Sequence, residues 1–92
     1  MRPKPLTSRQ IRAARALLGW TAEDLAKKAT LGLATIRRAE LAADTTSMTA
    51  ANDLAVRRAL EAAGIEFIDE DGGGPGVRMR RRQQPKRTSG GA

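Results

Sequence analysis

The chain has 92 residues, 17 basic and 10 acidic side chains, a net charge of +7, and no cysteine, histidine or tyrosine. This length allows one small domain. The composition excludes disulfides, thiolate metal sites, the commonest general base and the commonest metal ligand, so we expect no enzyme activity, cofactor or metal. The apolar runs are far shorter than the roughly 20 residues of a membrane span, and no signal-like apolar region follows Met1, which predicts a cytoplasmic protein without membrane contact.

The positive charge is concentrated at the C-terminal end of the chain. From Gly76 onward there are six basic residues and no acidic one, so residues 1–75 hold eleven basic side chains against all ten acidic ones. A basic segment attracts phosphate through counterion release, without reading base sequence. Such a tail can also serve solubility alone, but beside the helix pair described below we favour nucleic acid as its target.

The N-terminal part predicts an irregular basic arm followed by a helix. Two prolines and two cations among the first five residues favour a flexible arm. Thr7 can cap the helix, and Gln10 can reach back to it in a capping box. The helix is expected to run to about Leu18, with Gly19 in a left-handed conformation after it. The expected apolar stripe and packing anchors are Leu6, Ile11, Ala14, Leu17, Leu18 and Trp20, while Arg9, Arg12 and Arg15 keep largely to other sides.

The stretch from Thr21 to Glu40 has the spacing of two short helices joined by a tight turn. Thr21 can cap the first helix, and the second is expected over residues 33–42. The inner positions are apolar, and a small residue at Ala26 lets the helices approach: Leu25, Ala26, Ala29, Ile36 and Ala39. This pattern is typical of a helix-turn-helix, whose second helix enters the DNA major groove, although two amphipathic helices of a small bundle also produce it.

The remaining sequence predicts a longer helix and a hairpin. The helix is expected from about Met48 to Ala63, with five residues facing the core: Ala51, Leu54, Ala55, Ala59 and Leu60. Two alternating stretches, Ile65–Asp69 and Val77–Arg80, flank a glycine-rich turn and predict two strands. An isolated hairpin is marginal in water, so this one must pack on the helices through Phe67 and Met79 or pair with a second chain.

These elements predict a mainly α fold, a bundle of four or five helices with a small C-terminal β-hairpin. We divide the chain into a flexible basic arm (1–5), a helix-turn-helix domain (6–64), a hairpin extension that could supply a dimer contact (65–80) and a disordered basic tail (81–92). The acidic residues around the hairpin turn lack the spacing of a calcium loop, and no Gly-Lys-Ser/Thr follows its glycines. We interpret both as parts of the turn.

The candidate DNA contacts form three groups. Bases can be read from the second helix of the pair by Leu33, Ala34, Thr35, Arg37 and Arg38, of which Arg38 is the best candidate because arginine donates two hydrogen bonds to guanine. Phosphates suit helix N-termini and hydroxyls, which selects Thr21, Ala22, Glu23, Thr45, Thr46 and Ser47. Non-specific contacts are expected from Arg2, Lys4, Arg78, Arg80, Arg81 and Arg82. Ordinary capping or a solvated face would account for the same residues without DNA.

The residues from Leu6 to about Ile65 resemble the lambda-repressor/Cro-like helix-turn-helix family, often named the xenobiotic-response-element family, and within it a group of short proteobacterial regulators. The resemblance rests on Ile11-Arg-Ala-Ala-Arg-Ala-Leu-Leu-Gly-Trp20, Glu23-Asp-Leu-Ala26, Ala34-Thr-Ile-Arg-Arg-Ala-Glu40 and the closing stretches 57–67 and 72–78. It implies a domain of four or five helices that binds a two-fold operator as a dimer and represses or activates a promoter. It places base readers at Ala22, Leu33, Ala34 and Arg38.

The chain departs from the family at three positions. Ala22 stands where glutamine is usual, which removes a common DNA contact, and Gly32 stands where serine is usual. Thr30 replaces a glycine that often takes a positive φ, so we expect a different backbone there. Glu40 matches an acidic residue that usually supports the end of the second helix.

We therefore expect a sequence-specific transcriptional regulator that binds double-stranded DNA as a homodimer. The alternative is a protein-interaction module, an antitoxin or antiactivator, that uses the same helix face on a protein partner. The nearly neutral body and the apolar Leu33 and Ala34 favour this alternative. The two differ in salt dependence, because DNA binding weakens steeply with salt and an apolar protein contact does not.

Overall fold

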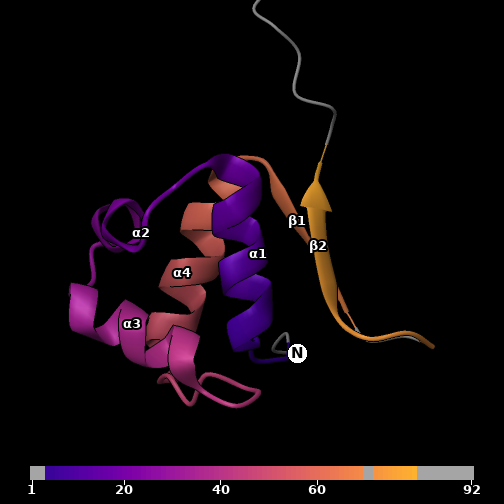
Figure 1. The fold of residues 1–92 in the computed structure, drawn as a ribbon, viewed down its shortest axis with the longest axis horizontal. Helices are drawn as coiled ribbons and strands as arrows, with labels where there is room; N and C mark the ends of the chain where they lie inside the picture. Colours follow the sequence, from indigo (N-terminus) through magenta and orange to yellow (C-terminus); the bar gives the residue numbers. More distant parts are fainter. Residues whose placement is uncertain (1–3, 70–71, 81–92) are drawn as a thin grey trace, which may run out of the picture.

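The computed structural model describes residues 4–69 and 72–80. Within these ranges the chain forms four helices and then a two-stranded antiparallel sheet (Figure 1). The elements are α1 (Ser8–Leu18), α2 (Ala22–Ala29), α3 (Leu33–Leu41), α4 (Ala50–Ala62), β1 (Ile65–Ile68) and β2 (Gly76–Met79). The predicted mainly α fold with a small hairpin is confirmed. The first three residues of the expected arm and all of the expected tail lie outside the described residues.

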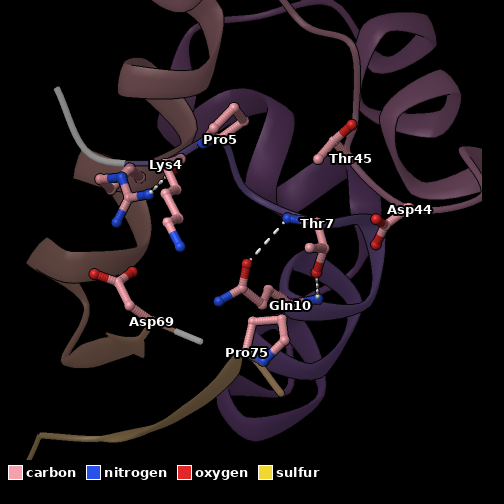
Figure 2. Close-up of a pocket in the computed structure, with 9 residues that line it drawn as sticks. Lys4, Pro5, Thr7, Gln10, Asp44, Thr45, Asp69 and Pro75 are labelled. Carbon is pink, nitrogen blue, oxygen red and sulfur yellow. Dashed lines mark hydrogen bonds between the residues drawn. The ribbon is translucent and has the colours of Figure 1, made fainter. Parts of the chain in front are cut away.

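Helix α1 begins and ends at the residues that its sequence signals predict. The Thr7 hydroxyl accepts the Gln10 N–H at 3.1 Å, and the Gln10 side-chain oxygen accepts the Thr7 N–H at 3.0 Å (Figure 2). Leu6 before the cap and Ile11 in the second turn are both fully buried, as a hydrophobic staple requires. Gly19 ends the helix with φ 71°, in the left-handed region.

Helix α2 has the same kind of start and a more strained end. Thr21 and Asp24 form a second capping box. The helix ends at Thr30, which has φ 59° and ψ 46°, so the chain keeps the left-handed conformation here and the expected change of backbone is wrong. A β-branched residue is strained in this region because its Cβ crowds the backbone. Residues 30–32 then lead directly into α3.

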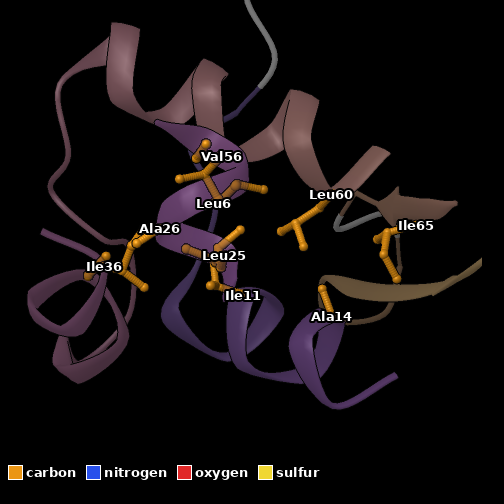
Figure 3. Close-up of a cluster of buried hydrophobic side chains, with 11 residues drawn as sticks. Leu6, Ile11, Ala14, Leu25, Ala26, Ile36, Val56, Leu60 and Ile65 are labelled. Carbon is orange, nitrogen blue, oxygen red and sulfur yellow. The ribbon is translucent and has the colours of Figure 1, made fainter. Parts of the chain in front are cut away.

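The hydrophobic core lies around α1 and α4. Helices α2 and α3 pack on one side of these two helices and the hairpin packs on the other (Figure 1). Side chains from the N-terminal segment, all four helices and β1 point toward one another (Figure 3). The buried apolar residues are Leu6, Ile11, Ala14, Leu25, Ala26, Ala29, Ile36, Ala39, Val56, Leu60 and Ile65. Ala26 and Ala29 are buried as expected where the helix pair meets.

Helix α4 starts later than predicted. It begins at Ala50, because the Thr49 hydroxyl accepts the Asn52 N–H at 3.1 Å and so caps the helix one residue after Met48. Residues 42–49 therefore form a longer connection from α3 than the sequence indicated. The residues that α4 buries are Val56, Arg57 and Leu60.

The predicted inner face of α4 is wrong at two residues. Ala51 and Leu54 are exposed, whereas Ala55 and Ala59 are half-buried and Leu60 is buried as expected. Two residues outside the predicted inner face are buried instead, namely Val56 and Arg57. The Arg57 side chain has two partners within the fold. Its Nη2 donates to the Lys4 carbonyl at 2.8 Å and its guanidinium lies 5.0 Å from the centre of the Phe67 ring. Val56, Arg57 and Leu60 form the buried stripe of α4, and Ala51 and Leu54 lie beside it.

The hairpin packs on the helices as the sequence predicts. Its strands pair from Ile65 opposite Met79 to Ile68 opposite Gly76. Phe67 and Met79 are half-buried against the core. Strand β2 lies along α1 and β1 lies along α4, so both strands have helical support.

The turn between α2 and α3 generates the first prediction. Replacing Thr30 with glycine should raise the free energy of unfolding by about 1 kcal/mol, because relief of left-handed strain outweighs the extra chain entropy of glycine. Gly19→Thr is the matched control, since a Cβ at Gly19 meets no atom within 4 Å and only the backbone conformation is tested. It should lower stability. Urea unfolding followed by circular dichroism measures both, and an unchanged or less stable Thr30→Gly variant would contradict the strain.

Candidate nucleic-acid interface

One face of α3 is open to solvent along the whole helix. Ala34, Arg37, Arg38 and Leu41 are exposed and follow the helical spacing of three and four residues. The opposite face buries Ile36, Ala39 and Glu40 in the fold. Two of the predicted base readers are less open than expected: Leu33 is half-buried and packs on the core, and Thr35 is half-buried. Leu33 thus does not face fully outward as expected, because part of its side chain packs against the core.

The exposed face of α3 carries only positive charge. Arg37 and Arg38 both lie on it. The single acidic residue of the helix, Glu40, faces inward, and only 9% of its side chain is exposed. An outside ligand therefore meets two guanidinium groups on this face and no carboxylate from the same helix. Arginines in this position suit base edges and phosphates.

A salt bridge between Arg15 and Glu40 holds α3 against α1. Arginine Nε donates to Oε2 at 2.6 Å and Nη2 donates to Oε1 at 2.8 Å, so the pair is bidentate. Arginine Nη1 also donates to the Trp20 carbonyl at 2.9 Å. The Glu40 carboxylate raises the pKa of Arg15. The pair fixes the rotation of α3 and hence the direction of its exposed face.

Sequence reasoning gave Glu40 a structural role but missed its partner. We expected Arg15 to lie largely on the solvent side of α1, and the structure turns it toward α3 instead. Twenty-five positions separate the two residues, so no local periodicity could pair them. The sequence offered one indication that Arg15 faces the fold: it directly follows Ala14, a predicted core position of α1.

The N-terminus of α3 differs from those of the other three helices. Thr7, Thr21 and Thr49 cap α1, α2 and α4 with side-chain oxygens, whereas Gly32 offers α3 no side-chain acceptor. The first N–H groups of a helix have no partner within it. At α3 the Thr35 N–H donates to the Gly32 carbonyl at 3.1 Å, so within the described chain only the N–H groups of Leu33 and Ala34 are left without an acceptor.

The N-terminus of α2 is less suited to phosphate than predicted. Asp24 lies in the first turn, and its carboxylate accepts the Thr21 N–H at 2.9 Å. Hydrogen bonds from Thr21 lower the pKa of Asp24, which is therefore ionised at neutral pH. Glu23 adds a second exposed carboxylate, and Ala22 is half-buried against the core. A phosphate here would meet two negative side chains.

The predicted hydroxyl cluster after α3 is only partly open. Thr45 and Ser47 are exposed, but Thr46 is 5% exposed. The Thr46 N–H donates to the Leu6 carbonyl at 3.2 Å and its hydroxyl accepts the Met48 N–H at 3.4 Å. Burial of Thr46 and these two hydrogen bonds disfavour the predicted phosphate contact from its hydroxyl. The N-cap position of α4, where a phosphate would find free N–H groups, belongs to Thr49 instead.

The basic residues of the hairpin lie away from α3. Arg78 forms an exposed ion pair with Glu66 at 3.0 Å, and Arg80 Nη2 donates to the Glu61 carbonyl at 2.9 Å. The hairpin packs on the side of α1 opposite to α2 and α3 (Figure 1). The structure thus does not join Arg78 and Arg80 to the arginine pair of α3. Arg2, Arg81 and Arg82 lie outside the described residues.

Lys4 is exposed beside a crevice of about 250 Å³ between the N-terminal segment, the loop after α3 and the hairpin (Figure 2). The same crevice is lined by Asp44 and Asp69. Charges of both signs meet there, so it is not an anion site comparable with the face of α3.

Comparison with protein families, curated proteins and solved structures finds no match to this chain. Within the described ranges, no three His, Cys, Asp or Glu side chains gather as a metal site would need, and no helix has the length and apolar character to cross a membrane. The candidate interface therefore rests on the exposed face of α3 and on the contacts that orient it.

The Arg15–Glu40 salt bridge generates the second prediction. Arg15→Met should lower the free energy of unfolding by about 2–3 kcal/mol, because it leaves the largely buried Glu40 carboxylate unpaired. The double variant Arg15→Met with Glu40→Met should be less destabilised than the sum of the two single variants. Urea unfolding of the four proteins measures this coupling. Strictly additive losses would show that the two side chains do not hold α3 in place.

Proposed function

We propose that this chain is a sequence-specific DNA-binding transcriptional regulator of the helix-turn-helix type, built on a lambda-repressor-like bundle, that binds a two-fold operator as a dimer. The observation that carries the proposal is the exposed face of α3, which has Arg37 and Arg38 but no acidic side chain. In this proposal α2 and α3 are the two helices of the motif and residues 30–32 are its turn.

The shape of α3 supports a major-groove contact. An α-helix fits the groove, which is about 12 Å wide. The side of α3 that carries Ala34, Arg37, Arg38 and Leu41 is exposed to solvent. Arg38 would donate two hydrogen bonds to a guanine, and Ala34 could contact a thymine methyl group. The N–H groups of Leu33 and Ala34, at the N-terminus of α3 that has no side-chain cap, would donate to a phosphate oxygen.

The experiment that tests the proposal is a gel shift with the DNA upstream of the coding region, in the presence of random competitor at physiological salt. A discrete complex that survives the competitor is expected. A smear that random DNA removes equally well would overturn sequence-specific recognition.

A protein-interaction module remains the second candidate, because Leu41 is 84% exposed at the end of the same helix. An antitoxin or antiactivator would use such an apolar side chain against a protein partner. Binding through this face would change little with salt, whereas the proposed DNA complex must weaken as salt rises.

The arginine pair generates the third prediction. Arg38→Ala should weaken binding to the operator by about 1–3 kcal/mol and binding to random DNA only slightly, because a hydrogen bond to a specific base forms at the cognate site alone. Arg58→Ala removes an exposed arginine from α4 and is the matched control; it should leave specificity unchanged. Fluorescence anisotropy on both duplexes provides the measurement. Equal losses on operator and random DNA would assign Arg38 to the phosphate backbone.

The basic end of the chain generates the fourth prediction. Deleting residues 80–92 should weaken binding to operator and random DNA alike, because the tail would neutralise phosphates without reading bases. The slope of log affinity against log salt should become shallower by nearly one unit for each phosphate that the shortened chain no longer neutralises. A titration across several salt concentrations measures the slope. If full-length and shortened chains share one slope, the tail does not contact DNA.

A further inference from the structure

The crevice beside Lys4 brings together segments that are far apart in the sequence. Its volume is about 250 Å³, and its walls come from the N-terminal segment, the start of α1, the loop after α3, α4 and the hairpin (Figure 2). Four of the residues that line it are charged, namely Lys4, Asp44, Arg57 and Asp69. We name this site the Lys4 crevice, and these four residues define it.

Arg57 places a buried cation at the Lys4 crevice. The residue is only 8% exposed, and its Nε N–H has no hydrogen-bond acceptor. Its one hydrogen bond within the described ranges runs from Nη2 to the Lys4 carbonyl, and no salt bridge found there includes it. Buried charges are normally paired. Nε itself is covered, so an anionic group from outside would meet the guanidinium at the edge that lines the crevice.

The surroundings of Arg57 favour an anion on the side of the Lys4 crevice. The residue also borders a hollow at the start of α4, where the other charged residue is Asp53. That hollow offers an anion no second cation. In the Lys4 crevice, by contrast, the Lys4 ammonium adds to the positive charge of the guanidinium.

The other charged groups of the crevice are exposed and do not pair with one another. Lys4, Asp44 and Asp69 take part in no salt bridge of the described part of the chain. The side chains of Lys4 and Asp69 nevertheless point toward the same space (Figure 2). A ligand with a carboxylate alone would meet both aspartates, and an amine alone would meet Lys4 and Arg57. A ligand that carries both charges can place each one beside the opposite sign.

Hydrogen bonds hold the walls of the Lys4 crevice in place. The Ser8 N–H donates to the Asp44 carbonyl at 2.8 Å, which fastens the loop after α3 to the start of α1. Gln10 Nε2 donates to the Gly76 carbonyl at 3.1 Å, which fastens the hairpin to the same helix. A site that exists before its ligand arrives requires little ordering on binding.

The size of the Lys4 crevice selects a small ligand. Its volume of about 250 Å³ lies below the roughly 300–1,000 Å³ of pockets for drug-sized molecules. Pro5 and Pro75 also line it, and their rings give the wall an apolar part. A short aliphatic group suits these rings. The volume, the two signs of charge and the apolar wall together describe a free α-amino acid.

We propose that the Lys4 crevice binds a free α-amino acid with a short aliphatic side chain. Its carboxylate lies toward Lys4 and Arg57, and its ammonium group lies toward Asp69, which shares the same space. The aliphatic side chain contacts the proline rings. Binding at this site does not depend on the proposed DNA contact, because the crevice lies apart from the exposed face of α3.

An NMR titration of the isotope-labelled full chain with L-valine tests the proposal. The side-chain NH2 group of Gln10 lines the crevice and reports binding directly. We expect its signals to shift and saturate with a Kd of about 1 mM or tighter. Isovalerate, which lacks the ammonium group, and isobutylamine, which lacks the carboxylate, should each bind at least about tenfold more weakly. Shifts that do not saturate by about 20 mM valine, or equal affinities for valine and isovalerate, would overturn the proposal.

Substitutions in the crevice test where the amino acid binds. Lys4→Met and Asp69→Asn should each weaken valine binding at least about tenfold. Lys4→Met keeps the backbone carbonyl that Arg57 uses, and circular dichroism verifies that each variant is folded. Lys27→Met and Glu23→Gln remove the same charges from exposed positions on α2 and are the matched controls; both should bind valine like the wild type. Unchanged affinity in either crevice variant would overturn the proposed site.

Discussion

The salt bridge between Arg15 and Glu40 is the interaction on which the candidate interface depends. It crosses from α1 to α3 with two hydrogen bonds, of 2.6 and 2.8 Å, and it withdraws the only carboxylate of α3 from the solvent side. One contact therefore fixes the rotation of the helix and leaves its outer face purely positive. If Glu40 faced outward, it would lie on the same helix turn as Arg37 and Arg38 and oppose any phosphate near them.

The N-terminal segment holds α4 through two hydrogen bonds, as the salt bridge holds α3. The Leu6 N–H donates to Asp53, and the Lys4 carbonyl accepts from Arg57, one helical turn further along α4. On its other side the same segment pairs with the loop after α3 through an isolated β-bridge. These polar contacts lie on the same side of α4 as the fully buried Val56 and Leu60, so together they fix the rotation of the helix. The exposed positions at the start of α4, among them Ala51 and Leu54, follow from that rotation.

Much of the fold could be predicted from the sequence because the signals for helix starts and ends are strong and local. The incorrect predictions concern residues whose burial depends on contacts with distant parts of the chain. The capping boxes at Thr7 and Thr21 each act over three residues, and the structure contains both. Arg57 is buried by partners that no spacing along the chain reveals. At the candidate site the sequence located α3 and its two exposed arginines but not the boundary between packing and exposure. Leu33 was expected outside and packs on the core, whereas Leu54 was expected inside and is exposed, because periodicity alone fits either face.

The turn before α3 contains two residues that are unfavourable for their local backbone positions. Thr30 occupies a left-handed conformation that favours glycine, and Gly32 leaves the next helix without a side-chain cap. Both features make α3 depend on tertiary contacts, namely the burial of Ile36 and Ala39 and the salt bridge to α1. Departures from locally stable sequence tend to lie where function requires them. Here the missing side-chain cap leaves the N–H groups of Leu33 and Ala34 at the N-terminus of α3 without an acceptor, and the proposed phosphate contact uses the same two groups.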